Sequence, residues 1–305
     1  MRVLIAGCGY LGLALGARLV AAGHQVSGMR RPGSDIVPLR HAGIVPVSAD
    51  LSIPQTLAGV SGNAWDWVVH CAAPAEHSES GYRAVYPGGA RHLLHALESS
   101  RPRSFVLVSS TSVYGQVDGS LVDEMSPTEP VGFGGRAMLE AEHVLRDAAA
   151  AGWTTVILRA AGLYGPGRNR LAAARRGEFR ASGDPSRWMN LIHRDDLAAA
   201  IVAAFECARG GTTYNVCDGS HATEAGFLGW IAGRVGAAPP QFAAPMAAST
   251  QGRAPTNKRV VGERLRRELG WVPAFPDFRA GYESILAVEH CQQLPLDTCV
   301  NSVHP

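Results

Sequence analysis

The chain has 305 residues, of which 46% are hydrophobic and 18% charged, and its formal net charge is +2. This length is enough for one large core, or for one domain with a smaller lobe. The small net charge argues against a nucleic-acid surface, and no stretch reaches the roughly 18 apolar residues that cross a membrane.

The first half of the chain alternates short apolar runs with longer stretches of helical periodicity. This alternation predicts βαβ units around a parallel sheet. The expected helices are Leu11–Ala22, Tyr82–Glu98 and Arg136–Ala150. The expected strands, in chain order, are Arg2–Ala6, Gln25–Met29, Val45–Ser48, Trp67–Cys71, Phe105–Ser109 and Thr154–Leu158. Six parallel strands in this order indicate an α/β fold with a Rossmann-type, doubly wound sheet.

After residue 165 the rhythm loosens into shorter elements. We expect residues 166–290 to form a smaller α/β lobe interleaved with the domain of residues 1–165, to which about 193–210 return. Residues 236–251 are an expected loop, and 291–305 an expected disordered tail. The elements expected in this half are helices at Leu171–Arg176, Arg194–Glu206, Phe227–Val235 and Glu263–Leu269, and a strand at Tyr214–Val216.

A Gly-x-Gly-x-x-Gly motif follows the first expected strand and opens the first expected helix, as Gly7-Cys-Gly9-Tyr10-Leu11-Gly12. In that context the first glycine permits a tight turn, the second lets the backbone approach a pyrophosphate, and the third lets helix and strand pack closely. The N–H groups at the helix start can bind phosphate oxygens. The motif therefore predicts that residues 1–165 are an NAD(P)-binding Rossmann domain.

The end of the second expected strand discriminates between cofactors. A carboxylate there would bind the ribose of NAD, but this chain has Arg30 and Arg31, which favour the 2′-phosphate of NADP(H) over NAD(H). The alternative is a pair of solvated arginines. Asp50 and Leu51, after the third expected strand, are placed to meet the adenine, although Asp50 is equally well explained as a turn residue.

The six cysteines form neither a Cys-x-x-Cys pair nor a Cys/His cluster with the spacing of zinc ligands. We therefore expect no disulfide framework, no metal and a reducing, cytoplasmic location.

Five motifs together resemble the extended short-chain dehydrogenase/reductase superfamily, over nearly the whole chain. Later segments, including Asn257-Lys-Arg-Val, resemble its YeeZ-like atypical subgroup, often labelled NAD-dependent epimerase/dehydratase. The resemblance implies that Cys71, Ala72 and Ala73 line the cofactor site. The five motifs are the glycine motif, Val69-His-Cys-Ala-Ala-Pro74, Ser109-Ser-Thr-Ser-Val-Tyr-Gly115, Leu158-Arg-Ala-Ala-Gly-Leu-Tyr-Gly-Pro-Gly-Arg168 and Asn190-Leu-Ile-His-Arg-Asp-Asp-Leu-Ala198.

The same resemblance implies a catalytic Ser/Thr after the fifth strand and a Tyr-x-x-x-Lys pair on the next helix. Ser110 matches the first position, but Gly134 and Met138 stand where the tyrosine and lysine should be. Because Lys258 is the only lysine and follows Ala254 by four positions, no Tyr-x-x-x-Lys exists anywhere in the chain.

The remaining candidates to offer a proton near the nicotinamide are Ser110, Tyr114 and Tyr164, although both phenols are also explained as loop-packing groups. A tyrosine without a nearby cation donates a proton better than it accepts one, so reduction is the favoured direction.

Three further residues are candidates for the substrate site. Arg168 and Arg187 are placed to meet an anionic substrate between the lobes, with solvated arginines as the alternative. His193 resembles the family's interlobe motif, and a structural histidine is its alternative.

These observations favour an NADP(H)-dependent oxidoreductase that reduces a small carbonyl or imine substrate without the usual pair. The alternatives are a non-catalytic NADP(H)-binding sensor or partner protein and, third, an NAD-dependent epimerase or dehydratase. The expected partner is a small molecule. By analogy with the superfamily, we also expect a homodimer through the helices at Tyr82–Glu98 and Arg136–Ala150.

Overall fold

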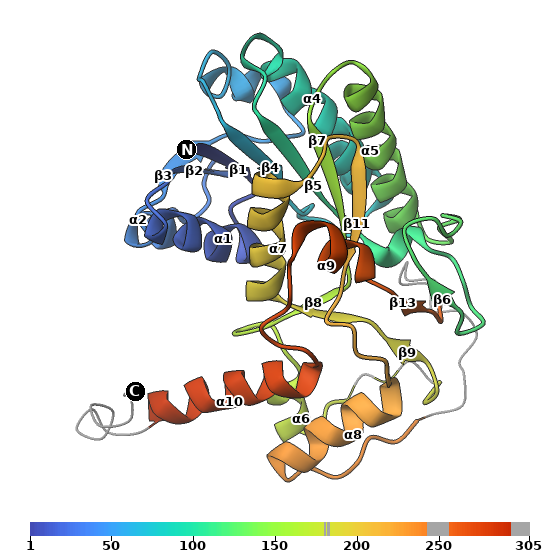
Figure 1. The fold of residues 1–305 in the computed structure, drawn as a ribbon. Coiled ribbons are helices and arrows are strands. Elements are labelled where there is room, and N and C mark those ends of the chain that lie inside the picture. The colour runs from blue at the N-terminus through green and yellow to red at the C-terminus, as the bar shows by residue number, and fades with distance from the viewer. Residues whose placement is uncertain (180, 182–183, 243–255, 294–305) are drawn as a thin grey trace.

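A seven-stranded parallel sheet forms the centre of the computed structural model, which describes residues 1–179, 181, 184–242 and 256–293. The strand order is β11-β7-β5-β4-β1-β2-β3, and every neighbouring pair is parallel. Figure 1 shows the sheet in the upper part of the molecule. The strands are β1 (Arg2–Ala6), β2 (Gln25–Arg30), β3 (Val45–Ser48), β4 (Trp67–His70), β5 (Ser104–Ser110), β7 (Thr155–Ala160) and β11 (Thr212–Val216). The expected doubly wound Rossmann-type sheet is confirmed.

The chain enters the sheet at β1, in its interior, and winds outward in both directions. The direction reverses between β1 and β4, and open α/β sheets place their ligands at the C-terminal ends of strands beside such a reversal. The loops after β1, β4, β5 and β7 are therefore the expected floor of a site.

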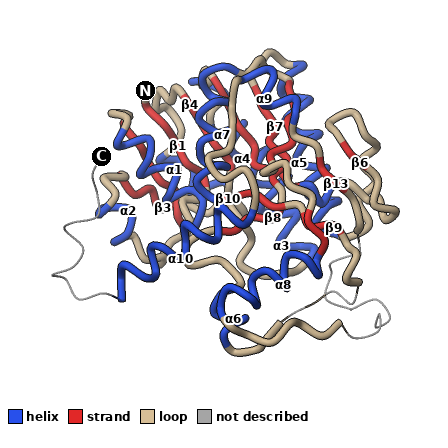
Figure 2. Tube along the Cα trace, turned by 60° about the horizontal axis from the view of Figure 1, so that its bottom comes forward, coloured by secondary structure: helices blue, strands red, loops and turns tan. Residues whose placement is uncertain are grey.

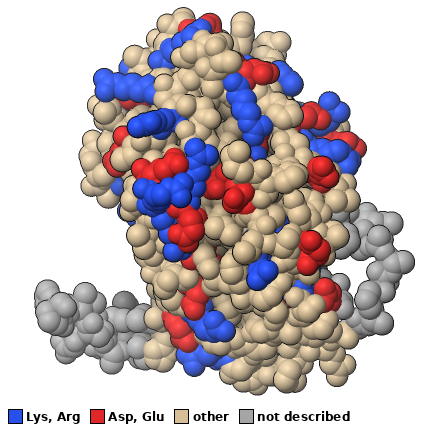
Figure 3. Space-filling model, turned by 45° about the vertical axis from the view of Figure 1, so that its right-hand side comes forward, with Lys and Arg blue, Asp and Glu red and all other residues tan. Residues whose placement is uncertain are grey.

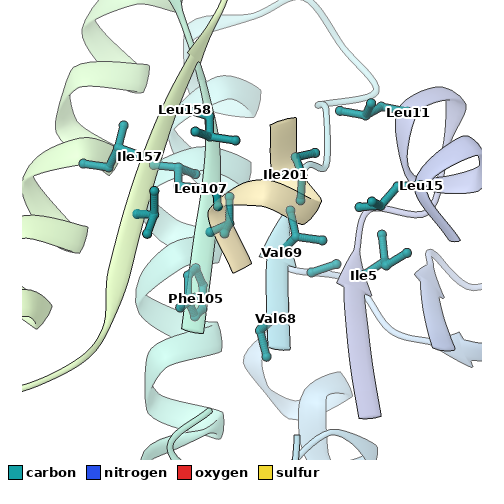
Figure 4. Packing of buried hydrophobic residues seen from close by; sticks show 14 of the residues in the cluster. Ile5, Leu11, Leu15, Val68, Val69, Phe105, Leu107, Ile157, Leu158 and Ile201 are labelled. Carbon is teal, nitrogen blue, oxygen red and sulfur yellow. The ribbon is translucent and has the colours of Figure 1, made fainter. Parts of the chain in front are cut away.

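Helices cover both faces of the sheet. On one face α1 (Tyr10–Ala21) packs against α7 (Arg194–Cys207), and on the other α4 (Gly89–Ala96) packs against α5 (Phe133–Ala150), as Figure 1 shows. The main hydrophobic core lies between these layers, with Ile5, Val69 and Leu107 at its centre in Figure 4. Each such buried aliphatic side chain contributes about 1.5–3 kcal/mol to folding.

A second hydrophobic cluster holds the smaller lobe together. Short strand pairs frame it: β8 (Gly162–Tyr164) with β10 (Leu191–His193), and β9 (Trp188–Met189) with β12 (Ala222–Thr223). Its helices are α6 (Leu171–Arg175), α8 (Glu224–Val235) and α10 (Phe278–Gln293), which Figure 2 shows below the sheet. The cluster consists of Tyr164, Leu171, Ala174, Leu191, Phe227, Leu228, Ile231, Phe278, Tyr282 and Ile285.

The remaining elements are short and lie at the edges or between the layers. β6 (Leu121–Val122) pairs in parallel with β13 (Arg259–Val260), and α9 (Glu263–Leu269) packs beside β11. The others are α2 (Val37–His41), α3 (Glu79–Arg83), a π-helical turn (Ala84–Gly88) and 3₁₀ turns at Pro54–Gly59, Glu98–Ser100 and Thr111–Val113.

Two expectations are corrected by these elements. The helix expected over Tyr82–Glu98 is divided into α3, the π-helical turn and α4, because Pro87 has no N–H to continue a regular helix. The tail expected from residue 291 is wrong for residues 291–293, which end α10, while residues 294–305 lie outside the described residues. Of the expected loop, 236–242 contain no helix or strand, and 243–251 lie outside the described part.

Basic and acidic side chains are interspersed on the face of the molecule in Figure 3. Among the helices of the described residues, none is both long and apolar enough to cross a membrane.

Candidate cofactor and active site

The glycine loop lies between the end of β1 and the start of α1, beside the end of β4. Gly7 has a φ of +102°, and a Cβ there would overlap the backbone of Ala72. A Cβ on Gly12 would lie 2.6 Å from the Gly7 carbonyl oxygen and 2.9 Å from the Ile5 side chain. A Cβ on Gly9, in contrast, would have no other described atom within 4 Å. Gly7 and Gly12 are thus needed because their surroundings leave no room for a side chain. At Gly9, in contrast, the space beside the backbone is open, and a ligand could approach it.

The first turn of α1 faces this open approach. The helix has no side-chain cap and no acidic residue in its first turn. The amides of Tyr10, Leu11 and Gly12 come too early in the helix to have intrahelical acceptors. They can donate hydrogen bonds to an anion, and the helix N-terminus carries a partial positive charge. The diphosphate of a dinucleotide would accept such hydrogen bonds and match this charge.

Arg30 is the last residue of β2 and reaches back to the glycine loop. Its Nε donates to the Cys8 carbonyl oxygen at 2.7 Å, and its Nη1 donates to the Asp35 carbonyl oxygen. Arg31, the next residue, is exposed. Two guanidinium groups therefore stand at the strand end where a dinucleotide would present its adenosine ribose.

Asp50 follows β3 at the same edge of the sheet. Its Oδ1 accepts hydrogen bonds from the backbone N–H and the hydroxyl of Ser52, at 2.8 and 2.6 Å. Leu51 is buried, and its carbonyl oxygen lies 2.7 Å from Nδ1 of His92. Asp50 is thus held as a turn residue, which was the alternative interpretation of this position.

The segment after β4 lies directly against the glycine loop. The Cys71 thiol donates to the Gly7 carbonyl oxygen at 3.3 Å, and Ala72 is the residue that a Cβ on Gly7 would overlap. Ala73 follows and is exposed. The structure therefore brings Cys71 and Ala72 to the glycine loop. That Cys71–Ala73 line the cofactor site stays a prediction from the resemblance.

Ser110 ends β5, at the C-terminal edge of the sheet. It is partly exposed, and its Oγ accepts a hydrogen bond from the Ser112 backbone N–H at 3.1 Å. Its hydroxyl hydrogen stays free to donate, so Ser110 keeps the geometry of a substrate-side hydrogen-bond donor.

Tyr114 points away from this edge into the core, where it is fully buried. Its hydroxyl donates to Asn215 Oδ1 and accepts from Arg159 Nη1, both at 2.8 Å. Arg159 is itself paired with the buried Glu142 at 2.8 and 3.0 Å. Burial raises the pKa of Tyr114. The expectation that Tyr114 donates a proton to substrate is corrected, because its hydroxyl is committed to a buried polar cluster.

Tyr164 is also buried, in the core of the smaller lobe. Its ring stacks on Tyr282, and a Cβ on Gly281 would overlap its hydroxyl oxygen. That oxygen has no hydrogen-bond partner among the described residues. Burial raises its pKa, and the nearby Asp218 adds to the rise. Tyr164 packs as a core ring and not as an exposed proton donor, which corrects its expected role.

Arg168 lies over Tyr10, beside the start of α1, and His193 lies close by, since a Cβ on Gly165 would come within 2.7 Å of the Tyr10 hydroxyl and 3.4 Å of His193 Nε2. The Asp195 backbone N–H donates to His193 Nδ1 at 3.2 Å, and burial lowers the pKa of His193, so the neutral ring carries its proton on Nε2. The guanidinium carbons of Arg168 and Arg194 lie 5.7 and 5.2 Å from the centre of the Tyr10 ring. Two cations from the second half of the chain are thus held next to the anion-binding end of α1.

Arg187 lies apart from this group. It pairs with Glu224 at 3.3 Å, and its positive charge contributes to lowering the pKa of Lys258. The three residues expected to meet a substrate therefore do not converge: Arg168 and His193 join the cofactor end, and Arg187 does not.

Lys258, the only lysine in the chain, had no role in the sequence interpretation. Its Nζ donates to the Tyr114 carbonyl oxygen at 2.8 Å, and its side chain is buried. Burial lowers its pKa to about 8. It ties the segment before β13 to the loop after β5, so the one lysine stabilises the joint between the two halves of the chain.

The position of the missing tyrosine is visible on α5. Gly134 lies in its first turn, under the ring of Tyr82, and Met138 is buried one turn later.

Within the described residues, no group of three or more His, Cys, Asp or Glu could hold a metal ion.

Comparison with known proteins gives a consistent result. Residues 3–217 match the model of the NAD dependent epimerase/dehydratase family. The chain is 30% identical over 283 residues to Protein YeeZ of Escherichia coli (strain K12), covering 90% of this chain and 97% of that protein. It is 30% identical over 308 residues to the 3-diazoavenalumate denitrifying reductase of a Streptomyces species, covering 92% and 99%.

A solved structure agrees with the sequence relatives. It is described as a putative NAD-dependent epimerase/dehydratase from Methylobacillus flagellatus. It superposes with a TM-score of 0.76 at 35% identity and covers 95% of this chain and 98% of that chain.

Proposed function

This chain belongs to the NAD-dependent epimerase/dehydratase family, within the extended short-chain dehydrogenase/reductase fold, and from that premise we propose that it is a cytoplasmic, NADP(H)-dependent reductase. Its substrate class is a small carbonyl or imine compound. When bound, NADPH supplies the hydride, and the protein supplies orientation and a proton.

The observation that carries this proposal is the open backbone at Gly9. Gly7 and Gly12 are packed so tightly that any side chain would clash, whereas Gly9 leaves free space before the uncapped end of α1. A structural turn alone would not need that open approach to three free amides, but a diphosphate does.

The preference for NADP(H) over NAD(H) is supported by charge at the end of β2. No carboxylate stands there to bind a ribose 2′-hydroxyl, and Arg30 and Arg31 stand there instead. Arg30 is anchored against the glycine loop by the Cys8 carbonyl oxygen, which holds its charge near that position. Arginine pairs well with phosphate through its planar, multiply donating guanidinium group.

Reduction is favoured over oxidation by what surrounds Ser110. Tyr114 and Tyr164 are buried, and α5 has neither tyrosine nor lysine at the family positions, so no strong base faces the edge of β5 from these residues. Abstracting a proton from an alcohol needs such a base, whereas reducing a carbonyl needs a donor. The similar Streptomyces protein is named as a reductase, which supports the same direction.

The non-catalytic alternative also has a specific observation behind it. Gly134 and Met138 replace both members of the usual pair, and an NADP(H)-binding sensor or partner protein needs neither. An epimerase or dehydratase is weaker, because transient oxidation of its substrate would need a base that neither Tyr114, Tyr164 nor α5 supplies.

The test is NADPH consumption, followed by absorbance in a stopped-flow instrument against aldehydes, ketones and cyclic imines. We expect single-turnover oxidation of NADPH by at least one of these classes. Tight binding of NADPH without any oxidation across the panel would instead support the sensor.

Location and assembly complete the proposal. Free thiols are found at Cys8, Cys71, Cys207 and Cys217, which suits a reducing compartment. By analogy with the superfamily, we also propose a homodimer through the helices of residues 82–98 and 136–150, which sedimentation velocity would test.

A further inference from the structure

The ring of Tyr82 lies against Gly134, the position of the missing tyrosine on α5. An ideal Cβ on Gly134 would lie 3.0 Å from Tyr82 Cε1, 3.4 Å from Cδ1 and 3.8 Å from Cζ. The ring of Tyr82 therefore covers Gly134 where a side chain from α5 would begin. A phenol is present at this place, but it comes from α3 and not from α5.

The hydroxyl of Tyr82 has a titratable partner. It lies 2.9 Å from His77 Nδ1, in the loop between β4 and α3. His77 is exposed, while Tyr82 is partly exposed. An imidazole ring in contact with water can exchange protons with it, and the His77 ring is also bonded to the phenol whose ring lies against α5. In the Tyr-x-x-x-Lys pair of the family a basic side chain lies next to a phenol. Here His77 takes the place of the lysine and Tyr82 that of the tyrosine.

Tyr82 is also held firmly in place. Its ring packs edge-on against Phe133 at 5.1 Å and against Tyr86 at 5.4 Å. Two ion pairs join the helices on either side, Arg83 to Glu140 at 3.3 Å and Arg136 to Glu79 at 3.7 Å. These exposed pairs contribute little free energy, but with the packed rings they fix the angle between α3 and α5.

The first turn of α5, which carries Gly134, also packs against the turn that follows β5. A Cβ on Gly135, the next residue of α5, would overlap the Ser112 carbonyl oxygen, so the first turn of α5 packs on the turn that follows β5. Ser110 caps that same turn. The first turn of α5 therefore contacts both the Tyr82 ring and the turn that Ser110 caps at the C-terminal end of β5.

From this geometry we propose that Tyr82 is the proton donor of the reaction and that His77 relays protons to it from water. The proposal rests on the proposed reductase function. Hydride transfer to the carbonyl carbon breaks the C=O π bond, the oxygen takes the Tyr82 hydroxyl proton, and NADPH becomes NADP⁺. The protonated His77 ring then returns a proton to the phenolate and regains its own from water.

The experiment compares the full-length protein with three variants in single-turnover oxidation of NADPH. The probes are methylglyoxal, benzaldehyde, acetophenone and 2-methyl-1-pyrroline. Tyr82→Phe keeps the ring and removes the hydroxyl, so we expect the hydride-transfer rate to fall about 100-fold or more with NADPH affinity within twofold of wild type. His77→Gln should change the pH dependence of that rate, a readout that a purely structural role would not move. Tyr214→Phe, which removes a phenol of β11 that bonds Glu268 of α9, is the matched control.

The outcomes separate this inference from the function it rests on. If wild type reduces a probe and Tyr82→Phe keeps more than half of the rate, the inference is overturned and the reductase stands. If wild type binds NADPH but reduces none of the four probes, the reductase proposal is weakened and a second measurement decides.

That measurement is the ¹³Cζ NMR signal of Tyr82, assigned by its loss in Tyr82→Phe. A shift of this signal on saturation with NADP⁺, together with a pH-dependent shift that disappears in His77→Gln, would support the pair at the nicotinamide. A signal that responds to neither change would overturn it.

Discussion

Replacing two glycines of the same loop by alanine should have opposite effects on stability and on cofactor binding. The two positions differ in what a new methyl group would meet. At Gly12 it would lie 2.6 Å from the Gly7 carbonyl oxygen, a backbone atom that cannot swing aside. At Gly9 it would project into open space. The glycine motif alone does not distinguish these positions, but the structure does.

The magnitudes follow from the distances. A carbon atom needs about 3.5 Å from its neighbours, so Gly12→Ala must displace the loop by several tenths of an ångström. Overpacking of this kind costs about 1–3 kcal/mol, and the better helix propensity of alanine offsets up to about 1 kcal/mol. We expect Gly12→Ala to lower the free energy of unfolding by about 1–2 kcal/mol, which corresponds to a fall of about 2–8 °C in Tm.

Gly9→Ala should leave the apo protein within about 1 kcal/mol of wild type. A phosphate oxygen approaches a backbone amide to about 2.9 Å, and a methyl group at Gly9 would hold it further away. Loss of the best of these contacts should weaken NADPH binding about 10- to 100-fold, or about 1.4–2.8 kcal/mol.

Two assays on both variants check this reasoning: thermal unfolding without cofactor and titration of NADPH fluorescence. Gly12→Ala should show a low Tm, and Gly9→Ala should be well folded but bind NADPH weakly. Wild-type NADPH affinity in Gly9→Ala would refute this reasoning, and so would an apo Tm for Gly9→Ala as low as that of Gly12→Ala.

Three further predictions concern the buried acid of the small lobe, the polar cluster of the core and the cation beside the cofactor loop. Burial raises the pKa of Asp218 from 3.8 to about 7, so its stabilising contribution is complete below about pH 4 and is lost as the pH rises through 7. Asp218→Asn cannot ionise, so its stability relative to wild type should grow from pH 5 to pH 8, by up to about 3 kcal/mol; an equal difference in urea unfolding at both pH values would contradict this. Arg159→Met removes two donors from the buried Glu142 carboxylate, which keeps its bonds from Ser109 and Arg146, and should cost about 3 kcal/mol in urea unfolding. A loss below about 1 kcal/mol would mean that the pair is dispensable. Arg168→Gln should weaken NADPH binding about 3- to 10-fold and make the binding less dependent on salt concentration. The control is Arg176→Gln, since the Arg176 guanidinium pairs with Glu178. Equal NADPH affinities in the two variants would place Arg168 outside the cofactor site.

Much of the sheet could be predicted because its strands are buried on both faces. Val3-Leu-Ile-Ala6 and Phe105-Val-Leu-Val108 are continuous apolar runs, and both became central strands within a residue or two of the expected bounds. The helix α10 was missed although its pattern was present. Phe278, Tyr282 and Ile285 recur at helical spacing and form its buried face.

The short strand pairs could not be predicted in the same way. β6 and β13 are two residues each and lie more than 130 residues apart, so their pairing depends on tertiary contacts and not on local pattern. The interruption at Pro87 was visible in the sequence, and the single expected helix ignored it.

In the candidate site, too, contacts between neighbours in the sequence could be predicted, and contacts between distant segments could not. The glycine loop is contiguous, so its turn and its helix start could be read from neighbouring residues. The direction in which Tyr114 points could not be predicted in this way. Its hydroxyl bonds Arg159 and Asn215 in the core, and neither residue is near it in the sequence. Tyr82 over Gly134 was likewise hidden, since the two residues come from different helices that only the fold brings together.

Binding of the reduced cofactor to the purified chain tests the central claim most directly. Isothermal titration with NADPH, and with NADH under the same conditions, should give one saturable site, at least tenfold tighter for NADPH. Equal affinities would remove the role of Arg30 and Arg31, and the absence of heat with either nucleotide would contradict the account of the glycine loop altogether.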